Sequence, residues 1–228
     1  MKKILSTLLA LAMLVSLTAF AEEARTVYVS ISDDNGALVQ AYAPVTLTDA
    51  DGDGALTICD ALMAAHTAYH PDGAAAFLAE DTEWGKSMYR LWGVENGGSY
   101  GYMLNDVSPM SLLDSVQPGD HIKAYAFTDL TNFGDTYSYF NAPVAAAAVN
   151  TEITLTLSAN GYDEAWNPMT YAVQGAFLVV DGEVDDRIVT DAEGQFVLTF
   201  PEAGVYTVSA VSNDLPLVLP VCIVTVTE

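Results

Sequence analysis

Residues 49–71 read DADGDGALTICDALMAAHTAYHP, an acidic, glycine-containing turn followed by a helical pattern. Apolar side chains recur in this pattern at the three- and four-residue spacing of one helix face, at Ile58, Leu62, Ala65 and Tyr69. The spacing predicts a helix over residues 57–69. Pro71 limits its end, because the residue before a proline disfavours the helical region. One helix among several extended segments predicts an α+β unit.

The first twelve residues of this stretch have the spacing of a calcium-binding loop. Calcium takes about six to eight oxygen ligands, and alternate residues of a tight loop point inward, so carboxylates two residues apart converge. Glycine at position 6 permits the sharp turn. The expected ligands are the carboxylates of Asp49, Asp51 and Asp53, the backbone carbonyl of Ala55, Thr57 through water, and Asp60 at position 12.

Asp60 stands where a longer glutamate is usual, which predicts modest affinity, adequate for the millimolar calcium outside cells. The sequence contains no second loop of this kind, so the expected role is a structural clamp rather than a sensor. The alternative is a plain acidic turn that caps the helix without a metal.

Extended patterns flank the helix and continue along the chain. In the first half, we expect strands over residues 25–31, 38–47, 100–104 and 121–127. Residues 142–149, APVAAAAV, have the composition of a connector. Beyond them, short strands alternate with turn signals, as is typical of a β-sandwich, over residues 152–158, 175–180, 187–190, 195–200, 204–209 and 217–226. The predicted fold is mostly β: an α+β domain over residues 22–143, then an all-β sandwich over residues 150–228.

The N-terminus has the order of a secretory signal peptide. Lys2 and Lys3 precede an apolar run that closes on Ala19-Phe20-Ala21, a small-x-small cleavage signal. We expect a signal peptide over residues 1–21, a secreted or cell-surface location, and no membrane insertion after cleavage. Cleavage takes the formal net charge from −23 to about −25, and such a charge repels nucleic acid.

Two motifs for catalysis or metal binding are present only in part. Residues 97–101, GGSYG, match the pattern of a hydrolase nucleophile elbow, but an elbow requires a helix after its turn, and residues 100–104 resemble a strand. His66 and His70 stand four residues apart without the glutamate of a zinc protease. The protein is therefore expected not to be an enzyme.

Aromatic residues are frequent in the first half. Most are expected in its core, and the alternative is a platform for a sugar or another flat ligand. They are Trp84, Tyr89, Trp92, Tyr100, Tyr102, Tyr125, Phe127, Phe133, Tyr137, Tyr139 and Phe140. The two cysteines, Cys59 and Cys222, are far apart in apolar surroundings, and we expect two free thiols.

Four segments carry a family resemblance: DADGDGALTICDAL at 49–62, LWGVENGGSYGY at 91–102, LN at 104–105 and VQPGDHI at 116–122. On these segments, residues 26–129 resemble the transcobalamin-like C-terminal domain family of bacterial surface proteins. The resemblance implies a β-grasp-like fold, with Asn105 at a hairpin and residues 118–120 at the turn before the last strand. Through TDAEGQF at 190–196 and AGVYTVSA at 203–210, residues 176–227 are similar to bacterial Ig-like or carboxypeptidase-regulatory-like sandwiches.

These observations predict a secreted or cell-surface, non-enzymatic binding or adhesion module stabilised by one structural calcium ion. The alternative is a corrinoid- or glycan-binding extracytoplasmic protein, and only the family name suggests the corrinoid. The expected partner is an extracellular protein, glycan or corrinoid, and the sequence does not specify which.

Overall fold

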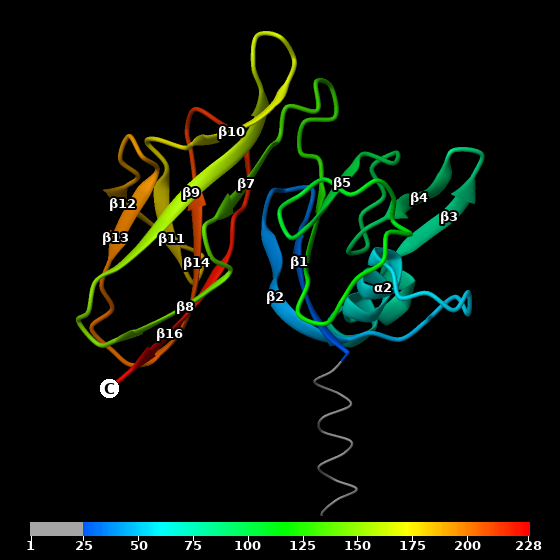
Figure 1. Ribbon diagram of the computed structural model, residues 1–228, viewed down its shortest axis with the longest axis horizontal. Helices are drawn as coiled ribbons and strands as arrows, with labels where there is room; N and C mark the ends of the chain where they lie inside the picture. The colour runs from blue at the N-terminus through cyan, green and yellow to red at the C-terminus, as the bar shows by residue number, and fades with distance from the viewer. Residues whose placement is uncertain (1–24) are drawn as a thin grey trace, which may run out of the picture.

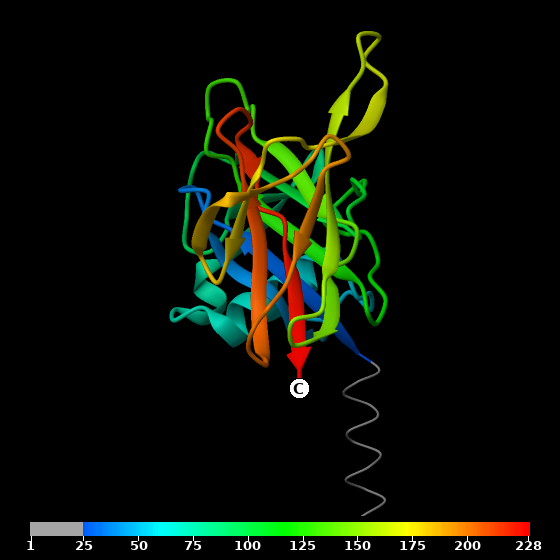
Figure 2. The ribbon, with the colours of Figure 1, turned by 90° about the vertical axis from the view of Figure 1, so that its left-hand side faces the viewer.

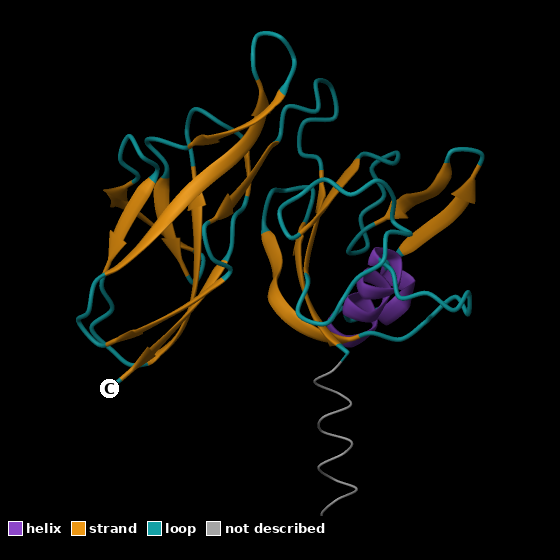
Figure 3. Ribbon diagram, in the orientation of Figure 1, coloured by secondary structure: helices purple, strands orange, loops and turns teal. Residues whose placement is uncertain are grey.

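The computed structural model describes residues 25–228, so the expected signal peptide, residues 1–21, lies outside the described residues. Strands make up 49% of the structure and helix 8%, which confirms a mostly β protein. Figure 3 shows strands in both halves and the α-helix in one of them. Within residues 25–228, no helix is long and apolar enough to cross a membrane.

The first unit is a mixed four-stranded sheet packed against helix α2 (Ile58–Tyr69), as Figure 1 shows. Its strands run in the order β2 (Leu38–Thr46), β1 (Thr26–Ser32), β6 (His121–Ala126) and β5 (Tyr100–Leu104). β1 is antiparallel to β2 and parallel to β6, and β5 is antiparallel to β6. Buried apolar side chains from both layers form the core, among them Val29, Ile31, Leu62 and Ile122.

Helix α2 begins within one residue of the predicted position because Thr57 caps it. The Thr57 hydroxyl accepts a hydrogen bond from the Asp60 backbone N–H at 3.3 Å, and the Asp60 carboxylate accepts one from the Thr57 backbone N–H at 3.0 Å. This reciprocal arrangement is a capping box. Leu62 and Ala65 lie on the buried face, in agreement with the predicted periodicity.

Three elements between α2 and β5 were not predicted: η1 (Gly73–Ala76), β3 (Leu78–Thr82) and β4 (Gly85–Arg90). β3 and β4 form a separate antiparallel hairpin, which extends away from the main sheet in Figure 1. Trp84 lies in its turn and is 88% exposed.

The second unit consists of two five-stranded sheets packed face to face (Figures 1 and 2). One sheet has the order β10 (Pro168–Ala172), β9 (Ile153–Tyr162), β7 (Thr136–Phe140) and β15 (Leu217–Val218), with β13 (Gln195–Leu198) also on β9. The other has the order β12 (Glu183–Val189), β11 (Phe177–Val180), β14 (Gly204–Val211), β16 (Cys222–Thr227) and β8 (Val144–Ala148). Side chains of both sheets form one core, among them Leu157, Phe196, Val208 and Val224.

The alanine-rich residues 142–149 do not form the expected connector. Val144–Ala148 is strand β8, which pairs in parallel with β16 from Ile223↔Val144 to Thr227↔Ala148. Strand formation depends on the available partner more than on intrinsic preference, so an alanine run can form an edge strand. Strand β7 also pairs with β9 and β15, so the sheets of the second unit begin at Thr136, ahead of residue 150.

A third, small core joins the two units. It contains Tyr125 of β6, Tyr137 of β7 and Val218 of β15. Lys123 is buried, with 4% of it exposed, and its Nζ donates a hydrogen bond to the Ser138 carbonyl at 3.1 Å across this junction. The junction is therefore packed and hydrogen-bonded rather than a loose tether.

The two cysteines lie in different cores. Cys59 belongs to the core of the first unit and Cys222 to that of the second, and both are buried as free thiols. Burial raises the pKa of each thiol to about 11, so both stay protonated at neutral pH.

Candidate functional site

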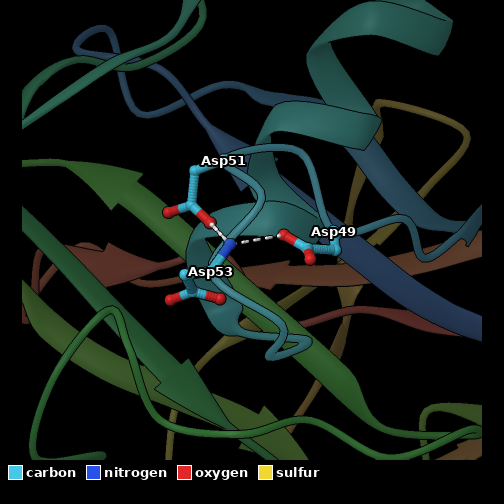
Figure 4. Close-up of side chains that lie close together, drawn as sticks. All are labelled: Asp49, Asp51 and Asp53. Atoms are coloured by element: carbon cyan, nitrogen blue, oxygen red, sulfur yellow. Dashed lines mark hydrogen bonds between the residues drawn. The ribbon is translucent and has the colours of Figure 1, made fainter.

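The acidic loop before α2 brings three of the expected calcium ligands together. One oxygen each from Asp49, Asp51 and Asp53 lies within 4.8 Å of the others, and all three residues are exposed. The Asp49 carboxylate accepts hydrogen bonds from the backbone N–H groups of Gly52 at 2.7 Å and Gly54 at 2.9 Å. In Figure 4, Asp49 and Asp51 both approach the backbone nitrogen of Asp53, at 3.1 and 3.4 Å. Backbone donors thus hold the carboxylates in place.

The other expected ligands lie differently. Asp60 is 2% exposed, and its carboxylate accepts hydrogen bonds from the Ala50 N–H at 2.8 Å and the Thr57 hydroxyl at 2.7 Å. Thr57 is buried as well, and the Ala55 N–H donates to the Asp53 carboxylate at 2.8 Å. The structure therefore places Asp60 and Thr57 at the helix N-terminus, outside the group of three loop carboxylates.

Three convergent carboxylates are a donor set suited to a hard divalent cation, which prefers oxygen ligands and completes its shell with water. A protein cation already lies beside them: Lys86 Nζ of β4 is 3.7 Å from Asp51 and 3.3 Å from Asp81. A metal ion in the loop would therefore compete with Lys86 for the Asp51 carboxylate.

His66, from the partial zinc-protease motif, is hydrogen-bonded within the fold. The His66 imidazole donates from Nδ1 to the Leu62 carbonyl at 2.6 Å and accepts at Nε2 from the Trp92 N–H at 2.9 Å. With both nitrogens bonded, His66 offers no metal ligand. Burial lowers its pKa to about 4, so the ring is neutral at neutral pH.

His121, a further histidine of the described chain, hydrogen-bonds Ser30 at 2.8 Å rather than Ser99. Ser30 and His121 are 2% and 5% exposed, so a substrate carbonyl has no access to this pair. Burial, with a contribution from Lys123, lowers the pKa of His121 to about 3. Ser99 lies in the turn before strand β5, with its N–H bonded to Asn96 at 3.0 Å, and no helix follows as an elbow requires.

A cavity of about 780 Å³ lies at the junction between the two units. We call it the junction cleft. Five rings on its wall form an unbroken series, the aromatic ribbon, with neighbouring centroids 5.5, 5.3, 6.2 and 6.0 Å apart in the order Phe133, Phe127, Tyr125, Tyr137 and Tyr139. Such spacings are those of favourable aromatic pairs. Strands of both units contribute, so the ribbon exists only when the units are joined.

One end of the cleft holds a fixed carboxylate. Asp106 accepts hydrogen bonds at Oδ1 from the Tyr137 hydroxyl at 2.6 Å and from Lys123 Nζ at 3.1 Å. Burial lowers the pKa of Lys123, and nearby Asp106 opposes this shift. Burial, together with Asp106, raises the pKa of Tyr137 well above its usual value, so its hydroxyl stays a donor.

The β9–β10 hairpin, which projects beyond the sheets in Figures 1 and 2, continues the wall of the cleft from strand β7. Thr170 Oγ1 lies 3.2 Å from Asn160 Oδ1 and 3.4 Å from the Tyr139 hydroxyl, which gives a row of uncharged polar groups beside the ribbon. Tyr162 and Met169 of the same hairpin also line the cleft and are exposed.

Sequence reasoning placed these aromatics mainly in a core. The structure gives both outcomes: Tyr125 and Tyr137 are buried, whereas Phe133 is 53% exposed. The signal that could have located the cleft is the density of aromatic residues from Tyr125 to Phe140, which spans the two strands that meet at the junction.

The chain was compared with protein-family models and with curated proteins. No family model matches it. No curated protein matches it significantly.

Proposed function

We propose that the protein is a secreted or cell-surface, non-enzymatic binding or adhesion module that holds its ligand in the junction cleft. The aromatic ribbon carries this proposal. Ligand sites are concave, largely apolar surfaces with a few placed polar groups, and the cleft has both features.

The chemistry of the described polar groups favours binding over catalysis. The one serine–histidine hydrogen bond that resembles a nucleophile and its base, Ser30–His121, is buried and lines none of the main cavities. In the cleft, Asp106 is tied to Lys123 and Tyr137, an arrangement that fixes an acceptor in place.

We further propose that calcium binds the acidic loop as a structural ion. The loop carboxylates Asp49, Asp51 and Asp53 would hold it, with water and backbone oxygen completing the shell. In Figure 1 the segment before α2 projects on the side of the first unit that faces away from β7, so an ion there would be remote from the cleft. The first unit then corresponds to a β-grasp-like, transcobalamin-like domain and the second to an Ig-like sandwich, as the resemblance implies.

The test is binding of the labelled mature protein to envelope fragments of the producing cells. Phe133→Ala removes an exposed ring of the ribbon and should lower the bound fraction several-fold, whereas Trp84→Ala removes an exposed ring on the β3–β4 hairpin and should not. Equal binding by wild type and Phe133→Ala would refute the cleft as the binding site.

A further inference from the structure

We infer that the ligand of the junction cleft is a neutral oligosaccharide chain. This inference rests on the proposed function and names the chemical class of the ligand. It follows from the shape of the aromatic ribbon, the character of its polar neighbours and the charges around it.

The ribbon suits a chain of sugar rings. The C–H groups of a pyranose face carry a small positive charge and pack favourably on the negative face of an aromatic ring. Two of the five rings, Tyr125 and Tyr137, are buried and support the series from within. The accessible rings stand at its two ends, so the ligand contacts are separated rather than confined to a single slot. A ligand gains most contact at the exposed Phe133 and half-buried Phe127 at one end and at the half-buried Tyr139 at the other.

The polar groups beside the ribbon match sugar hydroxyls. Both interactions of the Asp106 carboxylate use Oδ1, so Oδ2 remains as a fixed acceptor in the cleft wall. Next to Tyr139, Thr170 and Asn160 offer a hydroxyl and an amide. A neutral polyhydroxyl ligand pairs well with such a mixture of donors and acceptors.

Anionic ligands are disfavoured. The residues that line the cleft include Asp106 and Asp135 and contain no lysine or arginine, and the chain carries a formal net charge of −23. Lys123 offsets Asp106 only, so an acidic polysaccharide would meet net electrostatic repulsion from Asp135 and the rest of the chain.

Small organic cations are disfavoured as well, because the side chain of Lys123 already provides a cation beside the aromatic rings. Lys123 Nζ lies 4.7 Å from the centroid of Tyr137 and 5.9 Å from that of Tyr139. The second carboxylate of the cleft, Asp135, is already occupied: it accepts hydrogen bonds from the Thr128 hydroxyl at 2.6 Å and the Asp129 N–H at 3.0 Å. A quaternary ammonium group beside Tyr137 and Tyr139 would therefore compete with Lys123 for those rings and for Asp106.

The experiment is calorimetric titration of the mature protein with neutral hexasaccharides of glucose, xylose, mannose and N-acetylglucosamine. Parallel arms use an oligogalacturonate, choline and cobalamin. We expect micromolar to millimolar affinity for at least one neutral hexasaccharide and none for the other arms. Phe133→Ala and Thr170→Val, both at exposed positions, should each weaken that affinity, by roughly five- to tenfold for the ring. Trp84→Ala should leave it unchanged, and unchanged melting temperatures confirm that all variants are folded.

The outcomes separate the inference from the proposed function. If envelope binding depends on Phe133 but no neutral hexasaccharide binds or competes, the ligand class is wrong and the cleft stays the binding site. Binding of the oligogalacturonate, choline or cobalamin that Phe133→Ala abolishes leads to the same conclusion. If a neutral hexasaccharide binds equally well to Phe133→Ala and Thr170→Val, the inference is refuted because the sugar lies elsewhere.

Discussion

The ion pair between Lys123 and Asp106 lies on the first unit's side of the junction and should stabilise it, because Lys123 also bonds Ser138 and Asp106 bonds Tyr137 of the second unit. Asp106→Asn tests this. The substitution keeps the size of the side chain and an acceptor for Tyr137, but leaves Lys123 without a counter-charge. The pair is 3.1 Å apart, which corresponds to a Coulomb energy of about 5 kcal/mol at an effective dielectric constant of about 20. Lys123 is buried, whereas the Asp106 side chain is 26% exposed and partly screened. We therefore expect a loss of about 2–3 kcal/mol in the free energy of unfolding.

The assay is urea denaturation followed by tryptophan fluorescence, performed as a double-mutant cycle with Lys123→Met. Because the double variant contains no unpaired charge, it should recover most of the loss, with a coupling energy above about 1.5 kcal/mol. Asp185→Asn is the matched control: Asp185 pairs with Arg187 at 2.7 Å, but the Arg187 side chain is 84% exposed and solvent screens the pair, so the loss of stability should be much smaller than for Asp106→Asn. A cost of less than about 0.5 kcal/mol for Asp106→Asn, with additive singles, would refute the coupling.

Three further predictions concern pH, a turn and the acidic loop. His66 and His121 have pKa values of about 4 and 3 in the fold, so the unfolded chain binds more protons below pH 6.5 and stability falls on acidification. Between pH 6.5 and 5, each histidine should lower the free energy of unfolding by about 2 kcal/mol. The imidazole NMR signals of both should not titrate above pH 5, and titration near 6.5 would contradict this. Gly194→Ala should destabilise the second unit by more than about 1 kcal/mol in thermal unfolding, because φ is +75° and a Cβ would lie 2.5 Å from the Leu157 carbonyl; an unchanged melting temperature would contradict the strain. Millimolar calcium should raise the melting temperature, by about 2.7 kcal/mol of stability at a hundredfold excess over Kd, and Asp49→Ala should abolish the shift. Indifference of the wild type to calcium and to a chelator would leave the loop as an acidic turn.

Local signals in the sequence predicted several elements well. The predicted helix over residues 57–69 became α2, Ile58–Tyr69, because periodicity, cap and terminating proline agree. The strand predicted at 100–104 has those bounds in β5. Both elements are specified by their own residues and their nearest neighbours in the chain.

Elements defined by distant partners were missed. The alanines of β8 have no strand preference of their own, and only pairing with β16 makes them a strand. The junction cleft also depends on distant partners. Tyr125 lies on β6 and Tyr137 on β7, and these strands belong to different sheets that pack together at the junction. Asp60 was expected at position 12 of a calcium loop, and in the described structure its carboxylate closes the capping box of α2.

Strand β16 lies inside its sheet, hydrogen-bonded to β14 on one side and β8 on the other. The β8–β16 pairing links residues 144–148 with residues 223–227, one of the longest sequence separations in the fold. Such non-local pairing slows folding, because the intervening chain must be ordered before the contact forms. A chain that is synthesised N-terminus first cannot close this sheet until strand β16 has emerged. We therefore expect the second unit to stay open until then, while the first unit already has all its strands.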